Sequence, residues 1–276
     1  MIFSQKTFNI KKFKKKQRTT KYLKAKAQLL NCIEKKKYGF IEDLFNKDFN
    51  KILFIVKRLK KFDNVLFLGT GGSSLGGKTL VSLVRNQFYN STKPKIFFLE
   101  NIEYNQINEL LKKLNLKKTA CVVTSKSGET IETISQFFLI ENTFHRNKIS
   151  INKRIFIITE DKKSSLKKIQ ENKDLIFLPH PISVGGRFSV FSIVGLLPAA
   201  LVDFDIKKFC KGAEEFLFKI KNDKIFDEFF LPILSLIELN KTGINMSVIM
   251  PYSDSLNNLS FWYRQLWAES NGKRKR

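Results

Sequence analysis

Cysteine and histidine are scarce in this 276-residue sequence, which contains three cysteines and two histidines. Cys32, Cys121 and Cys210 are widely spaced, odd in number and without a CxxC pair, so they predict reduced thiols and not a disulfide framework. His145 and His180 have no neighbours of ligand type, which argues against a zinc site. His180 lies between two prolines, and we interpret it as structural.

The sequence also lacks an apolar run long enough to cross a bilayer. The longest run, residues 191–202, is about half a membrane span and contains Gly195 and Pro198, so it fits a buried helix better. The N-terminus is basic but lacks the apolar core and the cleavage site of a secretory signal. We therefore expect a cytoplasmic protein with no membrane partner.

Acidic residues are half as numerous as basic ones, 25 against 50, which gives a formal charge of +25. Residues 1–37 carry thirteen Lys or Arg against the single acid Glu34, so they supply +12, and the remaining excess is spread along the chain. Lysine, phenylalanine, isoleucine and asparagine are the residues of A/T-rich codons, and a biased genome accounts for their abundance. We expect no nucleic-acid partner, although the charge would draw anionic metabolites toward the protein.

A glycine-rich loop between a predicted strand and a predicted helix stands out in the first half of the chain. Residues 65–68 form an apolar run typical of a buried parallel strand, and apolar residues return at helical spacing after Ser74. These are Leu80, Leu83, Val84 and Phe88. Such a unit binds anions, because glycines permit positive φ and the first N–H groups of the helix are unpaired. The loop residues expected to face the anion are Gly69, Gly71, Gly72, Ser73 and Ser74.

Two nucleotide-binding motifs and a purely structural turn are alternatives for this loop. Residues 69–74 lack the final glycine or alanine of the dinucleotide fingerprint, so that match is weak. Residues 72–79 satisfy the P-loop pattern, with Lys78 for nucleotide phosphates, Thr79 for Mg²⁺ and Glu100 as a further Mg²⁺ partner. However, three residues separate the strand from the first glycine of that pattern. Glycines that serve only the turn are the structural alternative.

A second anion-binding sequence follows the predicted strand at residues 120–124. Ser125, Lys126, Ser127 and Thr130 precede a helical pattern that begins at residue 131. Hydroxyls and a lysine at a helix N-terminus predict another phosphate contact. Simple N-capping by Ser127 is the alternative.

Short apolar runs alternate with helical patterns along the chain, which is typical of α/β proteins. Strands are expected at residues 65–68, 95–99, 120–124, 154–159, 175–178 and 246–250. Helices are expected at residues 20–36, 52–59, 106–114, 165–170, 188–201, 206–220 and 226–240. The pattern predicts a doubly wound parallel sheet. We expect a basic N-terminal segment over residues 1–44, a first α/β domain over 45–203 and the beginning of a second over 204–276.

Gly185 and Gly186 precede Arg187 and a long apolar stretch. Two glycines allow a close-running backbone, which would deliver the guanidinium to a phosphate or to a developing oxyanion. An arginine at the start of a helix is otherwise a common solvated residue. This position therefore gains weight only together with the other motifs.

Four motifs in one order give a specific resemblance. The segments GTGGSSLGG, SKSGETIET, GGRFSVFSIVGLLPAAL and QLWAESNGK resemble the two phosphate motifs, the central signature and the catalytic signature of the glucose-6-phosphate isomerase family. Chains of that family contain two sugar-isomerase (SIS) domains. The resemblance covers residues from about 65 to 273, whereas the P-loop interpretation explains one motif of the four.

The resemblance implies a SIS domain followed by an incomplete second one, and an enzyme of glycolysis and gluconeogenesis. That enzyme interconverts glucose 6-phosphate and fructose 6-phosphate through an enediolate, with no metal or other cofactor. The residues implied to hold the sugar phosphate are Gly72, Ser73, Ser74, Ser125, Lys126, Ser127 and Thr130. Arg187 would stabilise the enediolate, and Glu269 would move the proton between C1 and C2. Gln265, one helical turn before Glu269, would contact the substrate.

The sequence also departs from the family pattern. The ring-opening histidine and the late catalytic lysine of the family lie downstream of the QLWAESNGK signature, near which the printed sequence ends, and neither His145 nor His180 matches that histidine. We therefore expect the N-terminal portion of an isomerase, with its own activity in question, and a homodimer for the full-length protein. A sugar-phosphate-binding SIS module without turnover is the main alternative, ahead of a P-loop NTPase.

Overall fold

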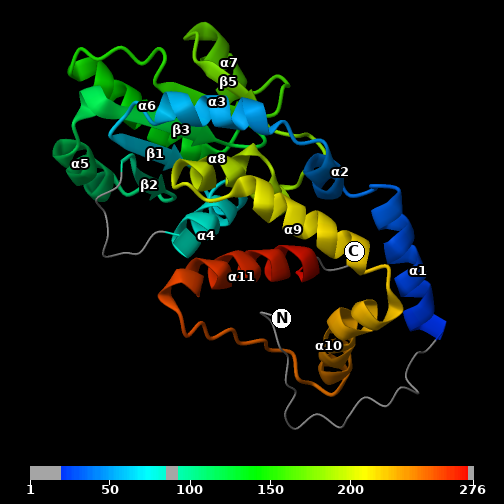
Figure 1. Cartoon of the computed structure of the whole chain (residues 1–276). Helices are drawn as coiled ribbons and strands as arrows, with labels where there is room; N and C mark the ends of the chain where they lie inside the picture. Colours follow the sequence, from blue (N-terminus) through cyan, green and yellow to red (C-terminus); the bar gives the residue numbers. More distant parts are fainter. Residues whose placement is uncertain (1–19, 85–92, 273–276) are drawn as a thin grey trace. The chain divides into compact units, whose positions relative to one another are not determined.

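The computed structural model describes residues 20–84 and 93–272 (Figure 1). Contacts divide the chain into a helical unit, Met1–Lys37 with Gly212–Val248, and a sheet unit, Tyr38–Lys211 with Ile249–Arg276. The domain boundaries inferred from the sequence, at residues 45 and 204, stay predictions. Within the described residues, no helix is both long enough and apolar enough for a bilayer crossing.

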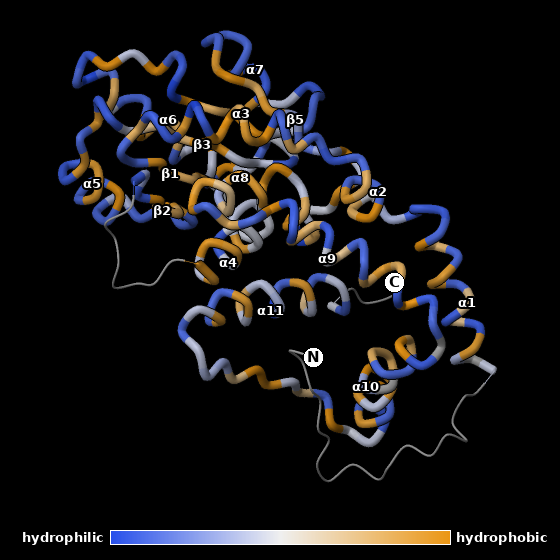
Figure 2. Tube along the Cα trace, in the orientation of Figure 1, coloured by the Kyte–Doolittle hydropathy of each residue, from blue (hydrophilic) through white to orange (hydrophobic). Residues whose placement is uncertain are grey.

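The sheet unit contains a five-stranded parallel sheet in the order β2-β1-β3-β4-β5. Its strands are β1 Asn64–Leu68, β2 Lys95–Leu99, β3 Thr119–Thr124, β4 Ile155–Thr159 and β5 Ile176–Pro179. Every residue of β1, β3 and β4 is buried, as expected for parallel strands that are covered on both faces. The central strands are accordingly among the apolar parts of the chain (Figure 2). The predicted doubly wound parallel sheet is confirmed.

Helices cover both faces of this sheet. One face packs Leu66, Leu68 and the alternate residues of β3 and β4 against α5 Tyr104–Lys113, α6 Ile131–Arg146 and α7 Ser165–Asn172. The opposite side of the sheet unit contains α3 Phe49–Leu59, α4 Leu75–Val84 and α8 Ile193–Leu201, and α8 contacts both α3 and α4. Successive side chains of a strand point to opposite faces of the sheet. Because β1, β3 and β4 are apolar along most of their length, the helices on both faces pack against apolar side chains.

Further α-helices and 3₁₀ turns complete the sheet unit. They are α2 Gly39–Phe45, α11 Asn257–Asn271 and the 3₁₀ turns η2 Gly71–Ser73, η3 Leu116–Lys118, η4 Gly186–Phe191 and η5 Asp254–Leu256. The predicted helix over residues 188–201 is divided, because Ser192 has an extended backbone and its side chain accepts a hydrogen bond from the Val194 N–H. Phe88, which we assigned to the helix after the glycine loop, lies outside the described residues.

The strand order places β1 between β2 and β3, so the chain leaves β1 toward one side of the sheet and leaves β3 toward the other. This is the topological switch point, where open α/β sheets bind ligands beyond the carboxyl ends of the strands. Leu68 lies opposite Val123 in the register of β1 and β3. A Cβ added to Gly69 would lie 2.9 Å from the Thr124 carbonyl oxygen. The two predicted anion-binding loops therefore start side by side.

The helical unit contains α1 Thr20–Glu34, most of α9 Ile206–Lys219, and α10 Asp223–Lys241. The Tyr22 hydroxyl donates a hydrogen bond of 2.5 Å to Asp227, and the rings of Tyr22 and Phe226 meet edge to face at 6.2 Å. These contacts join α1 to α10. The helices predicted in these regions are confirmed, with small shifts of their ends.

The strand predicted over residues 246–250 is wrong, because these residues have no regular secondary structure. Their apolar side chains are exposed, 84% for Met246 and 78% for Val248. A strand requires a hydrogen-bonded neighbour, and none of the described residues pairs with this segment. The segment has the residue types of a strand, but composition alone does not show whether a neighbouring strand is present.

Candidate functional site

The first loop is held against the η4 turn by backbone contact. Gly71 has φ of +53°, which favours glycine. A Cβ added to Gly72 would lie 2.3 Å from the Gly186 carbonyl carbon and 2.6 Å from the Arg187 nitrogen. The Ser189 hydroxyl donates a 2.8 Å hydrogen bond to the Gly72 oxygen. The close-running backbone expected before Arg187 therefore exists, and its partner is the glycine loop.

The serines at the end of this loop differ in burial. Ser74 is 3% exposed, and its Oγ has no hydrogen-bond partner among the described residues. It immediately precedes α4, whereas Ser73 is half-buried within η2. Leaving a buried hydroxyl without a partner costs free energy, and a phosphate oxygen at the start of α4 would accept a hydrogen bond from it.

The second loop gathers hydroxyl groups at the carboxyl end of β3. The Ser125 Oγ lies 2.8 Å from the Thr130 Oγ1 and 3.5 Å from the Ser127 Oγ. Gly128, with φ of +72°, donates its N–H to the Ser125 Oγ at 3.1 Å. Thr130 occupies the N-cap position of α6 without a side-chain cap bond. The alternative of N-capping by Ser127 is therefore wrong, since the Ser127 Oγ instead accepts from the Glu129 N–H.

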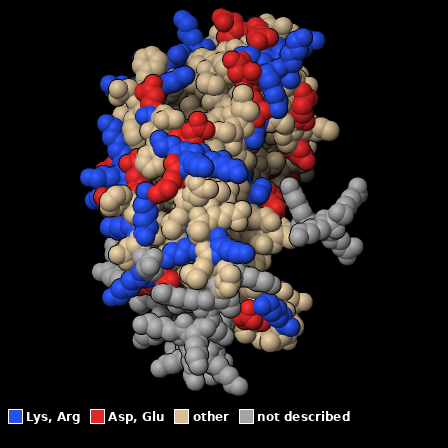
Figure 3. Space-filling model, turned by 90° about the vertical axis from the view of Figure 1, so that its right-hand side faces the viewer, with Lys and Arg blue, Asp and Glu red and all other residues tan. Residues whose placement is uncertain are grey.

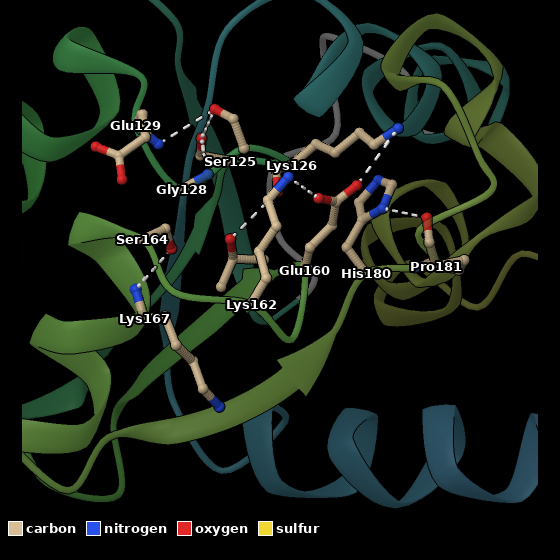
Figure 4. Close-up of polar contacts among 12 residues, drawn as sticks. Ser125, Lys126, Gly128, Glu129, Glu160, Lys162, Ser164, Lys167, His180 and Pro181 are labelled. Atoms are coloured by element: carbon tan, nitrogen blue, oxygen red, sulfur yellow. Dashed lines mark hydrogen bonds and ion pairs between the residues drawn. The ribbon is translucent and has the colours of Figure 1, made fainter.

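Lys126 in this loop faces the carboxylate of Glu160, which directly follows the next strand, β4. Glu160, whose side chain is 4% exposed, pairs with Lys126 at 3.5 Å and also contacts Lys162 (Figure 4). Burial raises the pKa of Glu160, but Lys162 and Lys126 lower it by more, so the pKa lies below its ordinary value. The carboxylate is thus ionised at neutral pH.

His180 is buried beside this pair, at the end of β5 (Figure 4). Its Nδ1 lies 2.9 Å from the Pro181 carbonyl oxygen, which can only accept, so Nδ1 carries the proton of the neutral ring. Burial lowers the pKa of His180 below its ordinary value. These contacts agree with the structural role that we inferred from the sequence.

The third group of site residues lies on α11, next to Arg187. The Arg187 Nη1 is 3.4 Å from the Glu269 Oε2, and its Nε donates to the Ser270 Oγ at 3.1 Å. The Gln265 Nε2 donates to the Glu269 Oε1 at 2.8 Å, as one helical turn between them predicts. Glu269 is 48% exposed and Arg187 24%. The base and the cation expected from the sequence are therefore neighbours.

Gln265 links α11 to the glycine loop. A Cβ added to Gly71 would lie 2.9 Å from the Gln265 Nε2. Direct contacts thus bring the first loop, Arg187, Gln265 and Glu269 together, while the second loop adjoins the first through the ends of β1 and β3. All of the site residues expected from the sequence belong to the sheet unit.

The residues of the P-loop alternative have other partners. Lys78 forms an ion pair with Glu100, and the Thr79 hydroxyl, which is buried, donates to the Leu75 carbonyl within α4. Thr79 is therefore not placed to hold Mg²⁺. Within the described part of the chain, no three His, Cys, Asp or Glu side chains cluster as a metal site would require.

The sequence reasoning missed three contributors to this arrangement. Glu160 pairs with Lys126, Ser270 accepts from Arg187, and the Trp262 Nε1 donates to the Arg187 carbonyl at 3.0 Å. A signal for Glu160 was present, because an acid directly after a predicted parallel strand lies at the ligand-binding edge. Trp262 offered none, since an aromatic residue at helical spacing is typical of a core position.

One face of the molecule shows how its charged side chains are arranged. On the face shown in Figure 3, Lys and Arg side chains lie among acidic and uncharged ones and do not form one continuous stripe.

Comparison with known proteins identifies relatives. The curated probable glucose-6-phosphate isomerase of Methanococcus maripaludis is 34% identical over 86% of this chain and 54% of its own length. A crystal structure of a hypothetical protein from Thermus thermophilus has a TM-score of 0.78 at 26% identity, covering 94% of this chain and 62% of that one. A glucose-6-phosphate isomerase structure from Chlamydia trachomatis has a TM-score of 0.69 at 27% identity, covering 81% and 43%.

The chain spans about half the length of the curated relatives it matches, 54% and 48% for two of them. The sequence profile of the family described as Phosphoglucose isomerase matches residues 43–276. This range contains all four motifs named in the sequence analysis. This chain therefore belongs to the phosphoglucose isomerase family.

Proposed function

We propose that this chain provides the phosphate-binding and proton-transfer residues of an aldose–ketose isomerase that interconverts glucose 6-phosphate and fructose 6-phosphate through an enediolate. The observation that carries the proposal is the contact between Arg187 and Glu269 at 3.4 Å, beside the backbone of the glycine loop. A carboxylate and a guanidinium at one place are the two groups that proton abstraction next to a carbonyl requires.

The sugar phosphate would bind at the switch point of the sheet. Its oxygens would accept hydrogen bonds from the unpartnered Ser74 hydroxyl and from the hydroxyl cluster after β3. The residues assigned to this contact are Gly72, Ser73, Ser74, Ser125, Lys126, Ser127 and Thr130. Lys126 would add a positive charge to the otherwise neutral donors.

Glu269 would act on the open-chain sugar above the phosphate site. In the direction from fructose 6-phosphate, its carboxylate takes a proton from C1, and the bonding electrons form the enediolate. The protonated carboxyl group then returns a proton to C2. The C1 hydroxyl loses its proton to solvent and becomes the aldehyde carbonyl, while the C2 oxygen takes up a proton from solvent and becomes a hydroxyl, which gives the aldose. Arg187 lies within contact of Glu269, so its guanidinium would stabilise the negative oxygen that develops beside the carboxylate.

Gln265 would orient the base during this transfer. Its amide donates to the Glu269 Oε1, while its own Oε1 is buried without a hydrogen-bond partner among the described residues. A sugar hydroxyl would supply the missing donor. None of these steps uses a metal or a nucleotide.

The proposal extends to assembly and location. A homodimer is the expectation that the family resemblance gives for the full-length protein, and a cytoplasmic location follows from the same resemblance to enzymes of sugar metabolism. Size-exclusion chromatography with light scattering tests the assembly.

Proton exchange with solvent tests the proposed chemistry on this chain. Fructose 6-phosphate incubated in D₂O would gain deuterium at C1, detected by proton NMR, because the enediolate is reprotonated from solvent. We expect Glu269→Gln to slow this exchange by about 10²-fold or more. Asp254→Asn, which makes the same chemical change at an exposed acid of η5, is the matched control and should exchange at the rate of the wild type.

The outcomes separate the competing functions. Equal exchange in the wild type and Glu269→Gln would remove Glu269 as the base. Calorimetric binding of fructose 6-phosphate with no deuterium exchange in the wild type would instead identify a binding module. Absence of both would contradict the proposal altogether.

A further inference from the structure

Glu160 is a buried acid at the ligand-binding edge of the sheet for which the proposed chemistry has no use. It follows β4 directly, and its side chain is 4% exposed. Burial of a charge is costly unless the charge is paired. Here the carboxylate meets two ammonium groups, those of Lys126 and Lys162 (Figure 4).

The end of β4 also fixes the backbone of Lys126. The Glu160 N–H donates to the Lys126 carbonyl at 3.2 Å, and the Thr159 hydroxyl reaches the same oxygen at 3.3 Å. One residue earlier, the Ser125 N–H donates to the Ile158 carbonyl at 3.0 Å. Hydrogen bonds therefore fix the main chain of Lys126 against the end of β4, and the ion pair with the Glu160 carboxylate also holds its side chain.

The two lysines differ in what they can do. Lys162 follows Glu160 by two residues in the β4–α7 loop, and its side chain is 55% exposed. Lys126 belongs to the hydroxyl-rich loop after β3, and its side chain is 33% exposed. An ammonium group has three N–H donors, so the contact with Glu160 leaves Lys126 with donors for a second anion.

We infer that Glu160 is a positioning residue that holds the Lys126 ammonium group at the carboxyl ends of β3 and β4 for the phosphate of the bound sugar. The inference rests on the proposed function, because it takes that phosphate as the second anion. Glu160 itself does not touch the substrate in this account. It acts through Lys126, the lysine of the second loop.

Positioning and simple electrostatics give opposite signs when Glu160 is neutralised. A carboxylate near a phosphate site repels the ligand, so its removal alone would tighten binding. If the carboxylate holds Lys126 in place, its removal releases a long side chain, and ordering that chain again on binding weakens affinity. The sign of the change in Kd therefore decides between the two.

The experiment is isothermal titration of fructose 6-phosphate into wild type, Glu160→Gln and Asp161→Asn. We expect Glu160→Gln to raise Kd about tenfold, the effect of losing a hydrogen bond to a charged group. Asp161→Asn removes the same charge one residue away, at an exposed side chain that pairs with Lys167, and should leave Kd unchanged or slightly lower. Unchanged or tighter binding by Glu160→Gln would overturn the inference.

Two further variants show whether the effect passes through Lys126. In a Lys126→Met background, Glu160→Gln should change Kd by less than about twofold, because the group it positions is absent. An undiminished tenfold effect there would overturn the positioning role. Glu160→Asp keeps the charge but shortens the reach, so it should also raise Kd, and it serves if Glu160→Gln does not fold.

The result for the wild type separates the two proposals. A wild type that binds fructose 6-phosphate while Glu160→Gln binds equally well overturns this inference alone. A folded wild type that binds no sugar phosphate overturns the proposed function, and the inference with it.

Discussion

Gly72→Ala tests whether the contact between the glycine loop and η4 builds the site. The new Cβ would lie 2.3 Å from the Gly186 carbonyl carbon and 2.6 Å from the Arg187 nitrogen, and both are backbone atoms. Carbon atoms pack at about 3.5 to 4.0 Å, so the two backbones must separate by roughly 1 Å. No side-chain rotation relieves this overlap.

The cost follows from two terms. Overpacking of this kind costs about 1–3 kcal/mol. Separation also weakens the hydrogen bond from Ser189 to the Gly72 oxygen, which contributes about 1 kcal/mol. We therefore expect the free energy of unfolding to fall by about 2–4 kcal/mol, which corresponds to a Tm lower by roughly 5 to 15 °C.

Thermal unfolding followed by circular dichroism measures this change, and calorimetry with fructose 6-phosphate measures the site. Binding should weaken, because Arg187 moves with the η4 backbone. Gly212→Ala is the matched control, since a Cβ there meets no atom within 4 Å and the position lies inside α9. That variant should gain about 0.5–1 kcal/mol of stability. A Gly72→Ala protein that melts with the wild type and binds equally well would refute the reasoning.

Two further predictions concern buried titratable groups. Burial lowers the pKa of His180 in the folded protein. Below about pH 6.5 this histidine therefore binds a proton in the unfolded chain but stays neutral in the folded one, so the free energy of unfolding decreases as the pH is lowered. Denaturant unfolding at pH 7.5 and 5.5 should show a loss smaller by about 1 kcal/mol in His180→Asn than in wild type; equal losses in the two proteins would contradict this. All three cysteines are buried thiols, and burial raises the pKa of Cys121. A thiol reagent should therefore react slowly with the native protein, and three thiols per chain should react after unfolding. Rapid native labelling would count against the described core. The cysteines are Cys32, Cys121 and Cys210.

The sheet was predictable because its strands are buried on both faces. Runs such as residues 120–124 are continuously apolar, and glycine-rich or hydroxyl-rich loops follow them directly. The two anion-binding loops were equally visible in the sequence, whereas the roles of Arg187 and Glu269 came from the family resemblance. Local pattern and fold agree in these regions.

The remaining features depend on distant partners. Residues 246–250 have the composition of a strand, but pairing decides whether a strand forms, and no neighbour lies among the described residues. Glu160 and Lys126 are 34 positions apart and meet only because β4 lies beside β3. The contact of Gly72 with Gly186 likewise joins segments that no local spacing relates.

The position of bound fructose 6-phosphate in a crystal structure of the complex tests the central claim most directly. Our account predicts phosphate oxygens about 2.7–3.2 Å from the Ser74 hydroxyl and from the hydroxyls of the loop after β3. It also predicts C1 and C2 within reach of the Glu269 carboxylate. A phosphate bound beside Lys78 instead, or a Glu269 side chain turned away from the sugar, would contradict it.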